Sequence, residues 1–148
     1  MEIKNRKAEY QYFLMAEYTA GIVLTGTEIK SIREGKANLS DAYCSFNDKG
    51  ELFVINMHIS VYSLGTYSNH EPKRPRKLLL NKKELKKIKN QTVEKGLTII
   101  PTLLFIDENG LAKLTINVAR GKKSYDKRES LKAKTDKREI ERHMSNYY

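Results

Sequence analysis

Residues 21–43, GIVLTGTEIKSIREGKANLSDAY, contain the pattern that decides the fold. The apolar run GIVL at its start is typical of a buried strand. Thr25 and Glu28 have the spacing of a capping box, in which each side chain binds a free amide at the start of a helix. Gly35 stands where a residue in the left-handed conformation often ends a helix. The stretch therefore predicts a strand, a helix of about two turns that begins near Gly26, and a loop.

The loop that follows this helix is predicted to bind the backbone of a nucleic acid. Lys36 supplies a cation and Asn38 an amide, close to the exposed backbone of Gly35. A phosphate and a sugar edge fit these groups better than the reacting atoms of a catalytic centre do.

The charge of the chain is strongly positive and unevenly distributed. The 148 residues, enough for one domain with its own core, carry a formal net charge of +10 and give a sequence pI near 9.6. Residues 73–95 hold ten Lys and Arg against two acids, and residues 120–148 hold ten against five. Ordinary solvated charge, the alternative, predicts more even mixing. The pattern favours a polyanionic partner, with nucleic acid ahead of a membrane surface.

The composition also indicates where the protein works. Cys44 is the single cysteine, so an internal disulfide is impossible and a reducing compartment is expected. The sequence has no apolar run of about 20 residues, and its charged N-terminus lacks the apolar centre of a signal peptide. We expect a soluble, cytoplasmic monomer that does not insert into a membrane.

The sequence offers binding rather than catalysis. His58 and His70 would suit a ribonuclease with paired imidazoles, but neither lies in a recognisable nucleophile or metal motif. The carboxylates of Glu28, Glu34 and Asp41 are close in sequence without forming a clear metal pair. We therefore predict no enzyme activity, no catalytic residue, no metal and no cofactor.

Two hairpins are expected further along the chain. Strands are predicted at 42–46 and 52–56, and again at 97–106 and 111–119, with a turn that ends in Gly between the members of each pair. The last of these strands alternates apolar and polar residues, as a half-buried strand does. Pro101 cannot donate to a strand ladder and predicts a bulge or an edge position.

The remaining segments complete the predicted architecture. A first strand is expected at 10–16 and a long surface loop at 60–76. Asn81 and Glu84 repeat the capping-box spacing and predict a helix at about 82–95, with an outer face made almost entirely of lysine. Short strands without a βαβ rhythm predict a mainly β protein, built as a small closed or partly closed antiparallel barrel with flanking helices.

The character of the chain changes at Gly121, which divides a domain at 1–120 from a basic tail at 121–148. Apolar residues in the tail are too sparse to bury a stripe, so we expect it to be disordered in the free protein. Tyr125 stands among cations, where a ring can stack on a base while the neighbours hold phosphates. An idle tyrosine is the alternative.

Four separated motifs occur in a fixed order: GTEIKSIREGKAN at 26–38, NMHIS at 56–60, RPRKLLL at 74–80 and ARGKKSYDKRE at 119–129. In this order they resemble the SsrA-binding protein family, also called small protein B. The motifs extend over nearly the whole chain, and four in register are far more specific than any one alone.

The resemblance implies an oligonucleotide-binding (OB) type barrel of about six strands with two to three helices. It implies binding to the tRNA-like domain of transfer-messenger RNA (SsrA RNA) and its delivery to stalled ribosomes for trans-translation. The tail would become helical on the ribosome, in the decoding centre and the empty mRNA channel formed by small-subunit ribosomal RNA. The implied RNA contacts are Asn5, Arg6, Lys7, Lys36, Asn38, His58, Arg76 and Lys77. The implied decoding-centre segment consists of Gly121, Lys122, Lys123, Tyr125, Asp126, Lys127 and Arg128.

Three positions depart from the family pattern. Val61 replaces a common proline, Glu71 replaces an aspartate before Pro72, and Thr19 stands where an acid is frequent.

Two other functions fit the residues: a general binding module of OB type for single-stranded or structured RNA, and a ribosome-associated structural protein. A preference for tRNA-like RNA would distinguish the function implied by the resemblance from the first alternative. Release from purified ribosomes would distinguish it from the second.

Overall fold

Antiparallel strands make up most of the described chain. The computed structural model describes residues 1–65 and 69–122. Its elements in chain order are β1 (Glu2–Lys4), α1 (Ala8–Gln11), β2 (Tyr12–Ile22), α2 (Gly26–Arg33), β3 (Ala37–Asn38), β4 (Tyr43–Phe46), β5 (Leu52–Ile55), β6 (His58–Ile59), β7 (Arg76–Leu79), α3 (Lys82–Gln91), β8 (Leu97–Ile106) and β9 (Ala112–Gly121).

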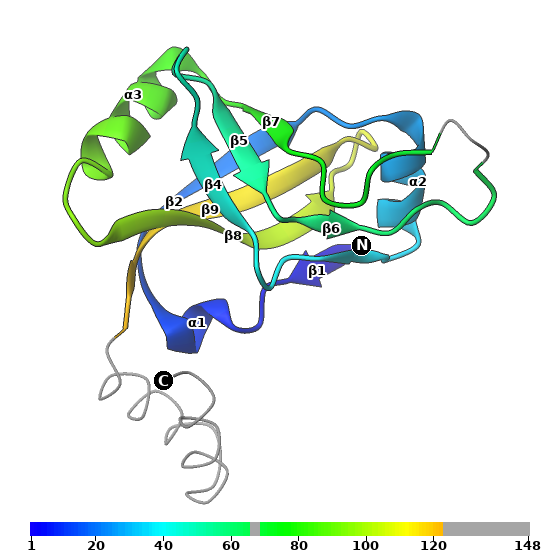
Figure 1. The fold of residues 1–148 in the computed structure, drawn as a ribbon, viewed down its shortest axis with the longest axis horizontal. Coiled ribbons are helices and arrows are strands. Elements are labelled where there is room, and N and C mark those ends of the chain that lie inside the picture. The colour runs from blue at the N-terminus through cyan, green and yellow to red at the C-terminus, as the bar shows by residue number, and fades with distance from the viewer. Residues whose placement is uncertain (66–68, 123–148) are drawn as a thin grey trace, which may run out of the picture.

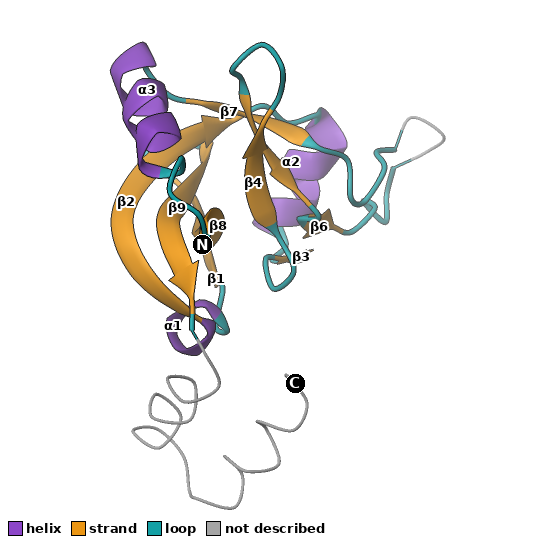
Figure 2. Ribbon diagram, turned by 60° about the vertical axis from the view of Figure 1, so that its left-hand side comes forward, coloured by secondary structure: helices purple, strands orange, loops and turns teal. Residues whose placement is uncertain are grey.

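Six of these strands pair in a closed ring. The sheet has the order β1-β8-β4-β5-β7-β2-β9, and β9 pairs again with β8, so each strand from β8 to β9 has two neighbours within the ring. β1 adds to β8, while β3 and β6 form a separate two-stranded sheet. Helices α2 and α3 lie at opposite ends of the molecule (Figures 1 and 2). The predicted class, mainly antiparallel β with flanking helices, is confirmed.

Helix α2 forms where the sequence predicts it. The Thr25 hydroxyl accepts a hydrogen bond from the Glu28 amide (3.4 Å), and the Glu28 carboxylate accepts one from the Thr25 amide (2.8 Å). Gly35 follows the helix with a φ of 75°, in the left-handed region that glycine adopts without strain. The capping box and the glycine stop are both confirmed.

The first strand differs from the prediction. The sequence predicts separate strands at 10–16 and 21–24, whereas helix α1 precedes a single strand, β2, that runs from Tyr12 to Ile22. β2 pairs with β9 over most of its length, beginning with Tyr12 opposite Gly121. The two short predictions therefore merge because pairing with a distant strand overrides the local pattern.

Both predicted hairpins are confirmed. β4 pairs with β5 and β8 pairs with β9, around turns in which Gly50 and Gly110 have φ near 80°. The register of β8 against β9 shifts between Pro101 and Leu103. The proline is thus accommodated by a bulge, as its missing amide requires.

Strand β9 is more buried than its alternating pattern predicts. Thr115 and Asn117, expected to face solvent, are both buried. On the same side of the strand, Ala8 of α1 packs with Ile100 and Ala119 in a second, small core. The short helix α1, which the sequence did not reveal, thus contributes to covering this face.

Helix α3 forms at the predicted place but is shorter. The Asn81 side chain accepts a hydrogen bond from the Glu84 amide (2.8 Å), and the Glu84 carboxylate accepts one from the Asn81 amide (3.3 Å). The helix stops at Gln91, short of the predicted 95, and the Thr92 hydroxyl donates to the carbonyl one turn earlier (3.0 Å). Such back-bonding satisfies one of the last free carbonyls of the helix.

Glu28 and Arg76 form an ion pair in the interior. Both side chains are fully buried, and Arg76 Nε donates to Glu28 Oε2. Arg74 Nη2 donates to the other carboxylate oxygen at 2.6 Å. Arg76 also donates through Nη1 to the Met57 carbonyl (2.7 Å) and through Nη2 to the Pro72 carbonyl (3.0 Å). Both charges thus have the additional partners that a buried pair needs.

The predicted surface loop at 60–76 also contains a buried histidine. His70 Nε2 lies 2.9 Å from the Ile59 carbonyl, which can only accept, so Nε2 carries the proton. Nδ1 then accepts from the Thr27 hydroxyl at 2.9 Å. His70 therefore joins the loop to α2 as a structural residue.

We predict that Glu28→Gln lowers the free energy of unfolding by about 3–5 kcal/mol, because Arg76 stays buried without its counter-charge. Urea unfolding at pH 7 measures this. Glu51→Gln is the matched control, since Glu51 pairs with Lys77 at the surface and its loss should change little. Equal stability of the two variants would contradict a structural role for the buried pair.

The same pair predicts a pH dependence. Burial alone raises the pKa of Glu28, but hydrogen bonds from Arg74, the Thr25 amide and Arg76 outweigh it and hold that pKa below its ordinary 4.5. The stability that this lowered pKa contributes is fully present above pH 4.5, and it is lost as the pH falls through the lower pKa of Glu28 in the folded state. The wild type should therefore lose more stability than Glu28→Gln over this acid range, as urea titrations at several pH values would measure.

Candidate nucleic-acid interface

The loop after α2 is held from both sides by its own backbone. The Lys36 amide donates to the Ser31 carbonyl, and the Ser60 amide donates to the Lys36 carbonyl, both at 3.0 Å. The Lys36 side chain is about half exposed and lies 3.3 Å from Glu34. The predicted loop thus presents its ammonium group from a fixed backbone.

Asn38 and His58 are brought together by the small sheet. They lie directly opposite each other in the β3–β6 pairing, so their side chains can lie on one face at close range. Asn38 Oδ1 accepts a hydrogen bond from the Ser40 amide at 2.8 Å, and the NH₂ group of Asn38 donates to no other group within residues 1–65 and 69–122. Two of the predicted RNA contacts, 20 residues apart in the chain, therefore share one small surface.

Arg6 reaches the same surface, whereas Asn5 has a different role. A polar hollow of about 550 Å³ is lined by Arg6, Asn38 and Ser40 among others. Asn5 Nδ2 donates to the carbonyls of Leu39 (3.3 Å) and Pro101 (2.9 Å). Asn5 thus fixes the chain that carries Arg6. Lys7 is exposed at the start of α1.

Two further predicted contacts lie elsewhere. Lys77 is on β7, opposite Phe53, and its ammonium group lies 2.6 Å from Glu51. Arg76 is fully buried against Glu28, so its side chain offers no surface to RNA in this structure. Arg76 therefore has a structural role in this structure, and its direct contact with RNA stays a prediction.

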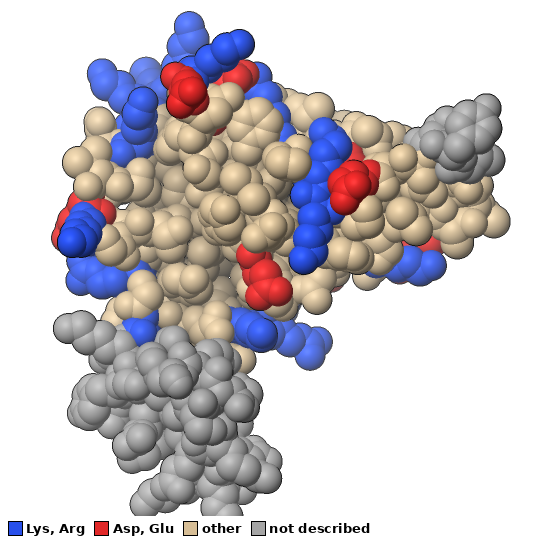
Figure 3. Space-filling view, viewed as in Figure 1, with Lys and Arg blue, Asp and Glu red and all other residues tan. Residues whose placement is uncertain are grey.

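A second basic region lies on α3. Figure 3 shows blue side chains gathered over this helix, at the end of the molecule away from α2. The predicted lysine face is exposed in the structure. Its members are Lys82, Lys83, Lys86, Lys87 and Lys89.

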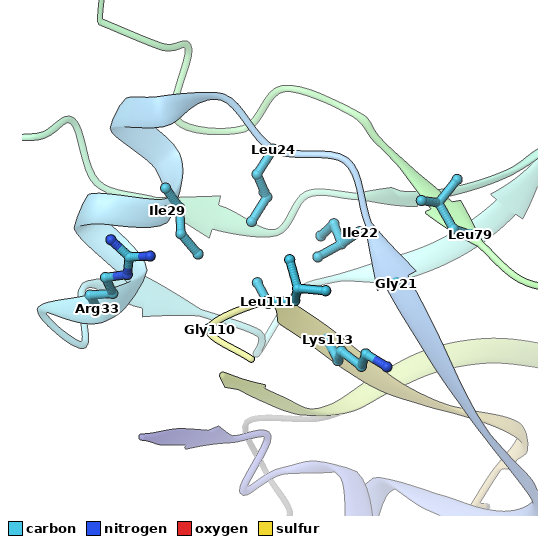
Figure 4. A pocket seen from close by; sticks show the side chains of 10 residues that line it. Gly21, Ile22, Leu24, Ile29, Arg33, Leu79, Gly110, Leu111 and Lys113 are labelled. Carbon is cyan, nitrogen blue, oxygen red and sulfur yellow. The ribbon is translucent and has the colours of Figure 1, made fainter. Parts of the chain in front are cut away.

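An apolar hollow of about 370 Å³ opens between α2, β2 and the β8–β9 turn. Figure 4 shows Leu24, Ile29 and Leu111 pointing into it, with Arg33 and Lys113 as its charged lining residues. It contains none of the predicted contacts. Within residues 1–65 and 69–122, no three potential metal ligands cluster, and no helix is long and apolar enough to cross a membrane.

Comparison with known proteins identifies the family. The family model described as SmpB protein matches residues 2–146. The chain belongs to the SmpB family. The SsrA-binding protein of Phocaeicola vulgatus is 59% identical over 142 residues, which cover 96% of this chain and 94% of that protein. The SsrA-binding protein of Christiangramia forsetii is 54% identical over 147 residues, covering 99% and 93%.

A solved structure supports the assignment to the SmpB family. It is described as "tmRNA-SmpB: a journey to the center of the bacterial ribosome". Its chain superimposes with a TM-score of 0.72 at 41% identity, covering 88% of this chain and 94% of that one. The family predicted from the four motifs is thereby confirmed.

The segment that resembles the SmpB tail motif is described only at its start. Gly121 ends β9, and the Lys122 amide donates to the Gln11 carbonyl at 2.9 Å. Lys122 Nζ donates to the Glu9 carbonyl (2.9 Å) and lies 5.0 Å from the centre of the Phe13 ring. The other predicted members, Lys123, Tyr125, Asp126, Lys127 and Arg128, lie outside the described residues.

Sequence reasoning missed three residues that lie beside Asn38 and His58. Asp41, Asn56 and Lys73 line one small pocket with them. Asn56 belongs to the NMHIS motif and has a φ of 61°, which asparagine tolerates better than most residues. No local signal in the sequence links Asp41 or Lys73 to the other two, because they meet only in the fold.

We predict different effects for Lys36→Ala and Asn38→Ala on binding to a tRNA-like RNA. Loss of the Lys36 charge should lower the slope of log affinity against log salt concentration by about one. Loss of the neutral Asn38 amide should weaken binding with little change in slope. Filter binding over a salt series measures both. Because both side chains are exposed, a large fall in the melting temperature of either variant would instead indicate a structural cap.

Proposed function

We propose that this protein is an SsrA-binding protein, which binds tmRNA and acts with it in the rescue of stalled ribosomes (trans-translation). The observation that carries the proposal is the family match over residues 2–146. The relatives' names and the ribosome structure add tmRNA and the ribosome as partners. The protein would act by binding RNA rather than by catalysis, as a monomer in the cytoplasm, where translation takes place.

The architecture assigned to this function is a domain at 1–120 with an OB-type closed barrel. The closed ring of six paired strands supports a barrel, since closure removes the free edges of a sheet. The basic tail at 121–148 would occupy the decoding centre and the mRNA channel as a helix.

The RNA-binding surface would centre on the polar surface around β3. Arg6, Lys36, Asn38 and His58 support this assignment because each is at least partly exposed there. Lys7 would extend the surface and Asn5 would hold Arg6 in place. Phosphate contacts of this kind position an RNA, while contacts to base edges give specificity.

A gel shift with the full chain tests the proposal. The protein should bind the tRNA-like domain of tmRNA at least about tenfold more tightly than an unstructured RNA of equal length, a difference of about 1.4 kcal/mol. Folded tRNA should compete better than the unstructured RNA. Equal affinities would favour the alternative of a general RNA-binding module.

We further predict a specific role for Tyr125, which the sequence places among the cations of the tail. Stacking on a base is worth about 1–3 kcal/mol. Tyr125→Ala should leave tmRNA binding unchanged but slow the first peptidyl transfer on ribosomes with truncated message, whereas Tyr125→Phe should retain much of the rate because it keeps the ring face. A wild-type rate for the triple variant Tyr125→Ala, Lys127→Ala, Arg128→Ala would show a passive tether.

A further inference from the structure

A small polar pocket lies at the centre of the β3–β6 surface. Its volume is about 210 Å³, and its lining residues are Asn38, Asp41, Asn56, His58 and Lys73. It shares Asn38 with the wider hollow that Arg6 lines. Pockets for drug-sized ligands measure about 300–1,000 Å³, so this one suits a smaller, flat group.

The side of the pocket formed by β3 is fixed by local hydrogen bonds. Asn38 stands opposite His58 in the β3–β6 register. The Ala42 amide donates to the Leu39 carbonyl at 3.0 Å, and this tight turn carries Asp41. The bond from the Ser40 amide to Asn38 Oδ1 closes the same turn.

The opposite side is fixed from within by Arg76. Its guanidinium donates to the carbonyl of Met57, the residue between Asn56 and His58. It also donates to the carbonyl of Pro72, the residue before Lys73. The backbone of this side is therefore set before any ligand arrives, which lowers the entropy lost on binding.

The side chains that line the pocket are largely uncommitted. Within residues 1–65 and 69–122, those of Asp41, Asn56, His58 and Lys73 take part in no hydrogen bond or ion pair given by the structure. Several convergent polar groups without partners are typical of a recognition site. The pocket thus offers a carboxylate acceptor beside amide and ammonium donors.

The carboxylate of Asp41 decides which ligand fits. An ionised carboxylate can only accept hydrogen bonds, so any RNA group that Asp41 binds is a donor: a ribose 2′-hydroxyl, which offers one hydrogen, or the N–H groups of a base. Among the four bases, only guanine presents two adjacent donors, N1–H and the N2 amino group, on its Watson–Crick edge. Adenine and cytosine place an acceptor beside their amino group, and uracil places its single N–H between two acceptors.

We propose that this pocket binds one unpaired guanine base of the RNA, with Asp41 accepting from its N1–H and N2–H groups. Lys73 and the amides of Asn38 and Asn56 then serve the acceptors O6 and N7. Unpaired bases are the usual targets of sequence-specific RNA recognition, because their edges are free. The inference rests on the proposed function and adds a base-specific subsite to it.

The variant Asp41→Asn tests this proposal, because recognition of guanine and mere proximity to phosphates predict different changes in RNA affinity. If Asp41 recognises guanine, the variant should bind the tRNA-like domain of tmRNA about tenfold more weakly, since a bidentate contact is lost. If Asp41 merely lies near phosphates, removal of its charge should leave binding unchanged or tighten it. Asp48→Asn, which removes the same charge from an exposed turn, is the matched control and should not weaken binding.

Modified RNA gives the second arm. Each unpaired guanosine of the tRNA-like domain is replaced in turn by inosine, which lacks the N2 amino group. One replacement should weaken wild-type binding about fivefold to tenfold, and Asp41→Asn should not respond to that replacement. Circular dichroism melting should show Asp41→Asn to be as stable as the wild type, because Asp41 is exposed.

The outcomes separate the two proposals. In one outcome the wild type prefers the tRNA-like domain to unstructured RNA, but no inosine replacement weakens its binding and Asp41→Asn binds with wild-type affinity. The guanine pocket is then wrong and the proposed function stands. If the wild type shows no preference for the tRNA-like domain, the proposed function itself is wrong.

Discussion

The buried ion pair between Glu28 and Arg76 joins helix α2 to strand β7, two elements that are far apart in the sequence. Glu28 belongs to the start of α2, and Arg76 belongs to the start of β7. Transfer of either charge into the interior is costly unless its bonding capacity is satisfied. The Thr25 amide and Arg74 complete the partners of Glu28, and three backbone carbonyls complete those of Arg76. Because each bond depends on the others, the helix, the loop before β7 and the segment that enters β6 are held in one arrangement.

This arrangement changes how the basic motif RPRKLLL contributes to an RNA-binding surface. In a strand, successive side chains point to opposite faces. Arg76 and Leu78 therefore point inward together, while Lys77 and Leu79 lie toward solvent. Arg76 affects the surface indirectly. It binds the carbonyl of Met57, which lies between Asn56 and His58 in the chain, and the carbonyl of Pro72, which comes just before Lys73. A cation in a motif shared with an RNA-binding family is thus not necessarily a cation that touches RNA.

The features that the sequence predicted correctly depend on residues close to one another in the chain. The capping boxes of Thr25 with Glu28 and of Asn81 with Glu84 are complete within three residues, and the glycine turns define both hairpins. The features that were missed depend on distant partners: the burial of Arg76 requires Glu28, and the second small core on β9 requires Ala8 of α1. The same reason applies to the site. Lys36 and Asn38 were visible in one short stretch, whereas Asp41 and Lys73 become neighbours only when β3 pairs with β6 and the loop folds back.

The closed ring of strands has a consequence for how the chain reaches this structure. β2 needs β9 as a partner, and the pairing begins with Tyr12 opposite Gly121. Contacts between such distant residues carry a large loop-closure cost and slow the folding of β proteins. During synthesis, β2 emerges early and keeps one edge unpaired until almost the whole described chain has left the ribosome. The protein therefore passes through a stage with an open strand edge, a feature that other chains can pair with, and only the emergence of β9 ends that exposure.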